Sequence, residues 1–149
     1  MSSYDTNLAA EFHVLSTLYR LGADANLTLG NKKSVDIAVI LDAGDSLTID
    51  VKGLAGTTGW PIDNLKTGTP RHFVVFVCYH GKIGDPMVAP LCWVVPSNDV
   101  AKLTYNAPGG RKLMRVSALK ATGDKYLNAW HSVLRDDKAP FLGASLAEL

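Results

Sequence analysis

Two short stretches of this sequence decide its fold: Val35-Asp-Ile-Ala-Val-Ile-Leu41 and Leu47-Thr-Ile-Asp-Val-Lys52. In each stretch an apolar side chain occupies every second position, and side chains on a β-strand alternate between two faces. The pattern therefore predicts two strands that bury one shared face. The opposite face carries Asp36 on the first strand, and Asp50 and Lys52 on the second.

The turn between these strands predicts how they pair. If residues 42 to 44 form a three-residue loop that ends in a left-handed glycine, Leu41 pairs with Asp45 and the numbers of paired residues sum to 86. This register places Asp36 opposite Asp50. The prediction is conditional on the turn type, because a slip of one residue would break the match.

The segment from residue 5 to residue 21 predicts a helix that ends before Gly22. Glu11 falls between Leu8 and Leu15, on the spacing that places side chains on one helical face. An acid in such an apolar stripe costs free energy unless a metal ion or a polar partner meets it. The alternative is a place at the edge of the stripe, where the carboxylate reaches water.

The whole chain, residues 1–149, is expected to form a single α/β domain, without an internal repeat or a linker. The predicted order is helix, three strands, a connector, two strands and two helices. After the first helix come strands at 27–29, 35–41, 47–52, 72–79 and 91–95, and helices at 98–104 and 124–134. Residues 105–119 are ambiguous.

Composition restricts the class of protein. Hydrophobic residues make up 47% of the 149 residues and charged residues 19%, as in ordinary globular domains. The first residues lack the pattern of a signal peptide and no apolar run is long enough to cross a bilayer, so we expect a cytoplasmic protein without membrane contact. Cys78 and Cys92 are expected to be buried, reduced thiols, and no spacing typical of a zinc site occurs.

Charge is distributed unevenly along the chain. Residues 1–51 hold three basic and seven acidic side chains, a net charge of −4, whereas residues 102–125 hold six basic side chains and one acidic, a net charge of +5. Such a basic segment would suit an enzyme that holds phosphates beside an acidic metal site. The nucleic-acid contacts expected are Lys66, Arg111, Lys112 and Arg115. A solvated basic surface is the alternative.

The polar face of the two strands predicts a metal site. Two carboxylates side by side repel each other unless a cation lies between them, which makes Asp36 and Asp50 candidate ligands of Mg²⁺. Glu11 would add a third carboxylate, and the backbone carbonyl of Val51 a fourth oxygen. Lys52 would orient the attacking water or stabilise charge on a phosphate. These residue types suit phosphodiester hydrolysis.

The run Asp36 … Ile49-Asp50-Val51-Lys52 resembles the motif of the PD-(D/E)XK nuclease superfamily, which includes restriction endonucleases and archaeal-type Holliday-junction resolvases. The resemblance implies a restriction-endonuclease-like core: a helix packed on a mixed central sheet of about five strands, with further helices on the other side. It also implies that Glu11, Asp36, Asp50 and Lys52 are catalytic, with Mg²⁺ as cofactor and Mn²⁺ as substitute. Val35 stands where the motif has proline, and Asp50 where glutamate is commoner.

These features favour a metal-dependent endonuclease with DNA as its substrate. A non-catalytic domain of the same fold that binds nucleic acid or protein is the alternative, and a purely structural domain is a third interpretation. Many small nucleases of this fold dimerise, and the sequence leaves open whether this chain forms a homodimer.

Overall fold

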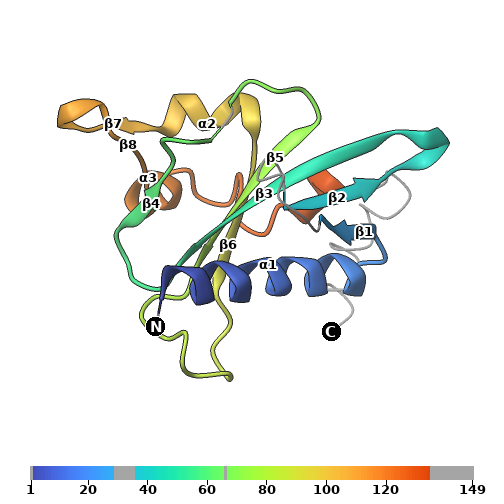
Figure 1. Cartoon of the computed structure of the whole chain (residues 1–149), viewed down its shortest axis with the longest axis horizontal. Coiled ribbons are helices and arrows are strands. Elements are labelled where there is room, and N and C mark those ends of the chain that lie inside the picture. Colours follow the sequence, from blue (N-terminus) through green and yellow to red (C-terminus); the bar gives the residue numbers. More distant parts are fainter. Residues whose placement is uncertain (1, 29–35, 66, 135–149) are drawn as a thin grey trace.

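A mixed five-stranded sheet in the order β1-β2-β3-β5-β6 forms the centre of the computed structural model, which describes residues 2–28, 36–65 and 67–134 (Figure 1). The strands are β1 (Asp24–Leu27), β2 (Ile37–Ile40), β3 (Ser46–Leu54), β5 (His72–Cys78) and β6 (Leu91–Pro96). β3 and β5 run parallel, and the other neighbours run antiparallel. The predicted α/β class with a mixed sheet of about five strands is confirmed.

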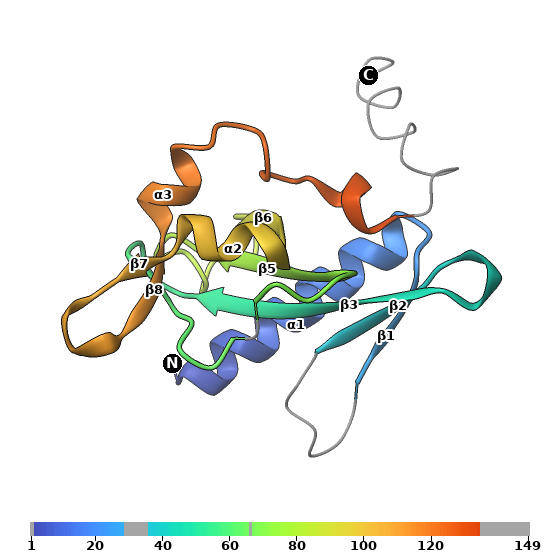
Figure 2. The ribbon, with the colours of Figure 1, turned by 90° about the horizontal axis from the view of Figure 1, so that it is seen from above.

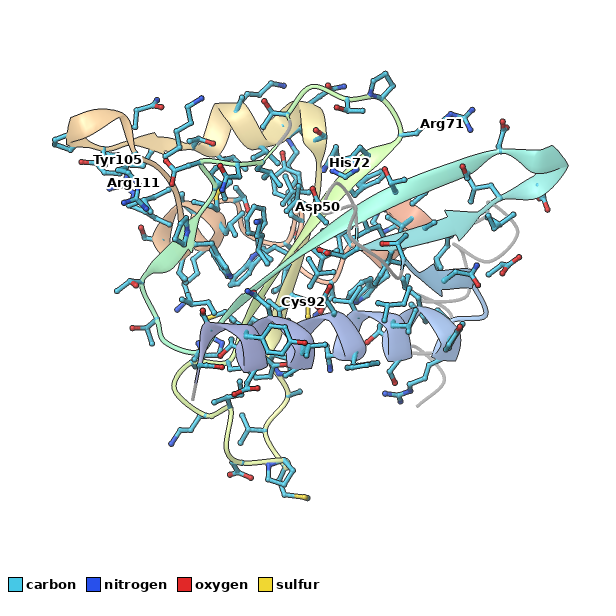
Figure 3. All side chains as sticks on the ribbon, in the orientation of Figure 1. Asp50, Arg71, His72, Cys92, Tyr105 and Arg111 are labelled. Carbon is cyan, nitrogen blue, oxygen red and sulfur yellow. The ribbon has the colours of Figure 1, made fainter. Side chains whose placement is uncertain are left out.

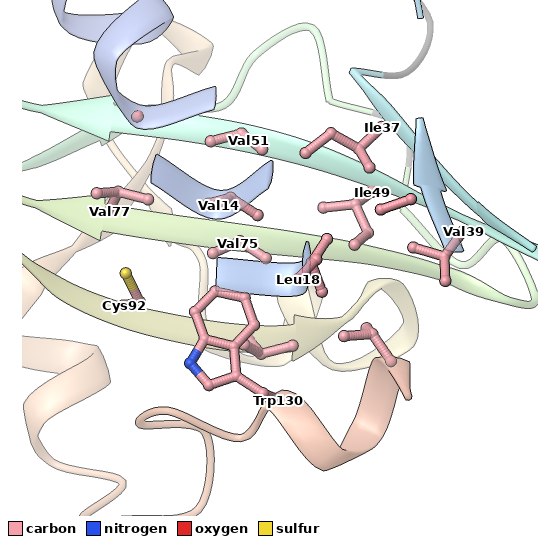
Figure 4. Packing of buried hydrophobic residues seen from close by; sticks show 14 of the residues in the cluster. Val14, Leu18, Ile37, Val39, Ile49, Val51, Val75, Val77, Cys92 and Trp130 are labelled. Atoms are coloured by element: carbon pink, nitrogen blue, oxygen red, sulfur yellow. The ribbon is translucent and has the colours of Figure 1, made fainter. Parts of the chain in front are cut away.

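Helix α1 (Ser3–Arg20) packs along one face of this sheet (Figure 1). Its fully buried side chains recur every four residues, which identifies the face turned to the sheet: Thr6, Ala10, Val14 and Leu18. Figure 4 shows Val14 and Leu18 packed among Ile49, Val51 and Val75 of the sheet. Glu11 is half-buried and lies at the edge of this buried face, which was the alternative to a place within the apolar stripe.

The other face of the sheet is covered by a second layer (Figure 1). It contains helices α2 (Ser97–Leu103) and α3 (Val116–Lys120), and a small antiparallel sheet of β4 (Gly59–Pro61), β8 (Lys112–Arg115) and β7 (Tyr105–Asn106). Trp60 anchors this layer, with its ring centroid 5.1 Å from that of Phe76 and 6.3 Å from that of Trp93. The expected helices on the second face are therefore present, and the ambiguous segment 105–119 supplies most of the small sheet.

The hairpin between β2 and β3 has the predicted turn and register. Residues Asp42–Gly44 form a short 3₁₀ helix, Gly44 has a φ of 82°, and the Leu41 N–H donates to the Asp45 carbonyl at 2.7 Å. The strand pairs run from Ile40 opposite Ser46 to Ile37 opposite Ile49, so every pair sums to 86. The turn chemistry was therefore sufficient to predict this pairing.

Gly53 brings α1 close to β3. A Cβ atom at this position would lie 2.8 Å from the Thr6 carbonyl oxygen and 3.0 Å from the Ala10 Cβ, so only glycine fits without a shift. The Gly53 N–H donates to Asn7 Oδ1 at 3.2 Å, which attaches the first turns of the helix to the strand. The close contact between α1 and β3 at Gly53 therefore determines how far Glu11 lies from the sheet.

The predicted helix at 124–134 is wrong. The segment forms only a 3₁₀ helix, η3 (Trp130–Val133), because Gly123 and Asn128 adopt positive φ values of 66° and 52° that end regular helices. The segment passes around the edge of β6, so Tyr126 packs in the second layer while Trp130 packs against the α1 face. The apolar face of a single helix could not have packed Tyr126 against one side of the sheet and Trp130 against the other.

Other expectations concern single positions. The short strand predicted at 27–29 is found at Asp24–Leu27, whereas Leu29, Val35 and Lys66 lie outside the described residues. Cys78 and Cys92 are buried free thiols, as predicted, and burial raises the pKa of Cys92 to about 12. Within the described ranges, no helix is long and apolar enough to cross a membrane.

Candidate active site

The candidate site lies at the edge of β3, where β2 stops. Asp36 directly precedes the last strand pair; its N–H donates to the Ile49 carbonyl at 3.0 Å. Its carboxylate accepts the Val51 N–H through Oδ2 at 2.7 Å. Asp36 therefore leaves the strand ladder and turns its side chain to the edge of β3, instead of lying opposite Asp50 on the polar face as the continued register predicts.

The backbone of Val51 points to the same edge. The N–H and C=O of one strand residue project toward the same neighbouring strand, and the Val51 N–H projects toward Asp36. The Val51 carbonyl oxygen therefore points to the edge that β2 leaves open, which is where the predicted backbone ligand has to lie.

Glu11 reaches this edge from α1. Its pKa is raised from 4.5 to about 7, first because burial disfavours its charged form, and then because the Asp36 carboxylate repels it and shares a hydrogen bond with it. The structure thus brings together two of the three predicted acids, from elements separated by 25 positions in the sequence. Two ionised carboxylates this close repel each other, which costs free energy unless a proton or a cation lies between them.

Asp50 lies on the opposite face of β3, where its side chain contacts β5. Its Oδ2 lies 3.1 Å from Nε2 of His72, the first residue of β5 (Figure 3). Nδ1 of His72 lies 2.6 Å from the hydroxyl of Thr48. The polar face of β3 therefore carries a chain of three side chains at the start of β5.

Lys52 follows Asp50 by two residues on the same strand and stands beside Phe76 of β5 in the parallel register. Its side chain is half-buried. Alternation along β3 thus places Lys52 on the same face as Asp50, as predicted. Asp36 lies at the strand edge, beside the Val51 N–H.

Of the predicted metal ligands, Glu11 and Asp36 meet at the β2 side of β3, whereas Asp50 is bonded to His72 on the β5 side. In the part of the chain that the structure describes, no three His, Cys, Asp or Glu side chains gather closely enough to form a ready cation site. Glu11 and Asp36 share a side-chain hydrogen bond. Mg²⁺ is commonly held by one or two carboxylates and retains several waters, so this pair and the Val51 carbonyl form a suitable set of hard donors.

The predicted nucleic-acid contacts lie mostly on the hairpin of β7 and β8. Arg111, Lys112 and Arg115 are exposed, and the guanidinium of Arg115 lies 4.1 Å from the centroid of the Tyr105 ring. The structure does not describe the fourth residue, Lys66. A basic hairpin with an exposed tyrosine combines the two features that bind nucleic-acid backbones and bases.

Asp63 holds this hairpin in place from the loop after β4. Its carboxylate accepts the Lys112 N–H at 2.8 Å and the Arg111 Nε–H at 3.1 Å. The hydrogen bond from Lys112 is the main reason that the pKa of Asp63 lies below its usual value, and the guanidinium of Arg111 adds to the effect. Asp63 therefore positions the hairpin and partly neutralises the charge of Arg111.

Sequence reasoning did not identify His72 as part of the site. The available signal was alternation, which places His72 on the same face of β5 as Val74 and Phe76. Its contact with Asp50 also depends on the parallel register of β3 and β5, in which Thr48 stands beside His72. No local pattern specifies that register, because a long connection separates the two strands.

Comparison with known proteins gives one informative match. No family model matches the chain, and no curated protein matches it. Among solved structures, the fold is similar to that of a bacterial homing endonuclease, I-Ssp6803I, with 18% sequence identity and a TM-score of 0.53. The match covers 96% of this chain and 98% of the other. It supports a nuclease fold along nearly the whole length of the protein.

Proposed function

We propose that this protein is a metal-dependent endonuclease that hydrolyses phosphodiester bonds in DNA. The observation that carries the proposal is the pair of acids Glu11 and Asp36, held against each other at the open edge of β3. Ionising two neighbouring carboxyl groups in a partly buried site costs free energy, and a divalent cation between them offsets that cost. Asp50 and Lys52, on the adjacent face of the same strand, supply the remaining side chains that the reaction needs.

The structural neighbour agrees with this proposal. Its name describes a homing endonuclease, and the similarity extends over 96% of the present chain. Membership of the PD-(D/E)XK superfamily would follow from the order of Glu11, Asp36, Asp50 and Lys52 along the same fold. At 18% identity the fold is shared, and the site residues have to carry the functional argument themselves.

The roles of the residues follow from their positions. Glu11, Asp36, Asp50 and the Val51 carbonyl would hold Mg²⁺, which supplies a Lewis acid that stabilises negative charge on a phosphate. Asp36 is oriented by the Val51 N–H, and its carboxylate shares a hydrogen bond with Glu11. Lys52 brings a positive charge to the same edge, where it orients water or offsets charge on the phosphate.

DNA would lie across the middle of β3. Figure 2 shows the β7–β8 hairpin and the β1–β2 pair at opposite ends of β3. The basic residues of the hairpin would hold the phosphate backbone at one end of this surface. This arrangement separates binding, at the hairpin, from chemistry, at the edge of β3.

A cleavage assay tests the proposal. The full chain is incubated with supercoiled, linear, branched and single-stranded DNA, with Mg²⁺, Mn²⁺ or a chelator. We expect metal-dependent cleavage of at least one substrate, and loss of cleavage in Asp36→Asn and in Lys52→Ala. Cleavage that survives Lys52→Ala, or no metal-dependent cleavage of any substrate, would contradict the proposal.

A non-catalytic nucleic-acid-binding domain is the second candidate. It is favoured by the lack of a three-ligand cluster among the residues described. It requires DNA binding that is equal in wild type, Asp36→Asn and Lys52→Ala, with no effect of Mn²⁺. A metal requirement for cleavage distinguishes the first candidate from this one.

A further inference from the structure

His72 is an enclosed histidine that the roles described above leave unused. It begins β5, and its side chain is only 4% exposed. It stands beside Thr48 in the parallel register, on the face of the sheet that also carries Asp50. Buried ring nitrogens need hydrogen-bond partners, and in this structure each nitrogen of His72 has one.

The two nitrogens have different partners. Nδ1 lies 2.6 Å from the Thr48 hydroxyl oxygen, and Nε2 lies 3.1 Å from Asp50 Oδ2. A carboxylate in its ionised form can only accept hydrogen bonds, so in the tautomer that suits this contact the Nε2–H of His72 donates a hydrogen bond to Asp50 Oδ2. The Thr48 hydroxyl can donate to Nδ1, which satisfies the ring in its neutral form.

This chain of hydrogen bonds restrains one oxygen of Asp50. The side chain of Asp50 is 13% exposed, so water competes only weakly for the carboxylate. Oδ2 is bound to the imidazole, whereas Oδ1 has no hydrogen-bond partner within residues 2–28, 36–65 and 67–134. A carboxylate held at one oxygen and unengaged at the other is the arrangement in which a neighbouring residue orients a metal ligand.

We propose that His72 is a positioning residue for the metal site: it holds Oδ2 of Asp50 so that Oδ1 is presented to a divalent cation. Thr48 contributes by fixing the tautomer and the orientation of the ring. The inference rests on the proposed function, because it takes Asp50 as a metal ligand. It adds a requirement that the sequence motif does not contain.

A purely structural role for His72 gives a different expectation. Loss of a buried hydrogen-bonded side chain would then lower the stability of the protein and leave its affinity for metal unchanged. Metal affinity and thermal stability are therefore measured separately, on the full chain.

Calorimetric titration of Mn²⁺ into wild type, His72→Leu and His72→Gln tests the proposal. Glutamine places an amide N–H near the position of Nε2 and can still donate to Asp50, whereas leucine cannot. We expect His72→Leu to bind Mn²⁺ about 10- to 100-fold more weakly, the usual effect of losing a residue that orients a ligand. We expect His72→Gln to recover most of the affinity. Melting curves without metal report the stability of each variant.

The controls separate this inference from the proposed function. Equal Mn²⁺ affinity in wild type and His72→Leu, with binding abolished by Asp50→Asn, would overturn the role of His72 and leave the proposed function standing. No Mn²⁺ binding by wild type would overturn both. If His72→Leu does not fold, His72→Asn replaces it, because its shorter amide reaches toward Thr48 and not toward Asp50. Equal affinity in His72→Asn and His72→Gln would then overturn the inference.

Discussion

The pairing of Glu11 with Asp36 explains why an acid occupies a half-buried position on α1. Burial and the neighbouring carboxylate both oppose its ionisation, so the pKa of Glu11 rises to about 7. The raised pKa means that the folded protein binds this proton more tightly than the unfolded chain does. The free-energy cost of holding Glu11 beside Asp36 is therefore largest when Glu11 is ionised and no cation is present.

This cost has a defined dependence on pH. The metal-free protein should lose stability as the pH rises from 4.5, the ordinary pKa of the carboxyl group, through about 7, its pKa in the folded state. Glu11→Gln should lack that loss, so the variant should gain stability relative to wild type between about pH 5 and about pH 8. Urea denaturation at both pH values, with a chelator present, measures the difference.

The exposed acid Asp124 provides the control for this measurement. Asp124→Asn removes one carboxylate without touching the pair at β3, so its stability relative to wild type should change little over the same pH range. A pH response in Glu11→Gln no larger than that in Asp124→Asn would show that Glu11 carries no such cost.

At the scale of elements, the contact between α1 and β3 determines where Glu11 lies. Gly53→Ala would place a methyl group against the Thr6 carbonyl and the Ala10 side chain, so the helix must move away from the strand. Overpacking of this kind costs about 1–3 kcal/mol. We expect denaturant unfolding of Gly53→Ala to show that loss, and its cleavage of DNA to fall because Glu11 moves with the helix.

Gly84→Ala is the matched control, because a Cβ at position 84 meets nothing within 4 Å. Its stability should stay within about 0.5 kcal/mol of wild type, as is usual for surface substitutions, and its cleavage rate should be unchanged. Equal effects of the two substitutions would mean that the approach of α1 to β3 is not what positions the site.

The β7–β8 hairpin is the element that we expect to bind the DNA backbone. Each phosphate contact that is lost should reduce the salt dependence of binding by about one unit in the slope of log K against log salt concentration. Arg111→Ala and Arg115→Ala should each show this reduction together with weaker binding, measured by fluorescence anisotropy over a range of salt concentrations. The effect should be similar for DNA of different sequences.

Lys82 serves as the control for charge alone. It is exposed on the loop between β5 and β6, which lies at the bottom of Figure 1 whereas the hairpin lies at the top. Lys82→Ala should leave the salt slope unchanged. The same slope in Arg115→Ala and Lys82→Ala would indicate that the hairpin is a solvated basic surface and not a DNA contact.

At the scale of the whole molecule, the central sheet separates two apolar layers, and the candidate site lies where both faces meet the edge of β3. Glu11 lies on the α1 side of the sheet, and Asp50 lies on the face that α2 and the small sheet cover. A bound cation would therefore join elements from both layers. Its binding energy should add to the stability of the fold as a whole.

Thermal unfolding with and without Mn²⁺ tests this linkage. A ligand that binds only the folded state at 100 times its dissociation constant adds about 2.7 kcal/mol, so Mn²⁺ should raise the Tm of wild type. Asp36→Asn should show no metal-dependent rise. An equal rise in both proteins would mean that the ion binds elsewhere.

Local sequence patterns were sufficient to predict the elements whose contacts are short-range. Alternation and turn chemistry were sufficient to predict β2, β3 and their register, because a three-residue loop leaves little freedom of pairing. Helical spacing predicted α1, and it left open whether Glu11 lies in the apolar stripe or at its edge. The final helix was mispredicted because its apolar residues serve two different layers, which a single helical period cannot reveal.

The grouping of the site residues depends on contacts between segments that are distant in the sequence. Asp36 leaves its strand and meets Glu11 at the edge of β3, so the acids pair differently from the register prediction. His72 joins Asp50 because β5 aligns in parallel beside β3. Both contacts join segments that are distant in sequence, and their positions follow from packing against the shared sheet, which no local pattern encodes.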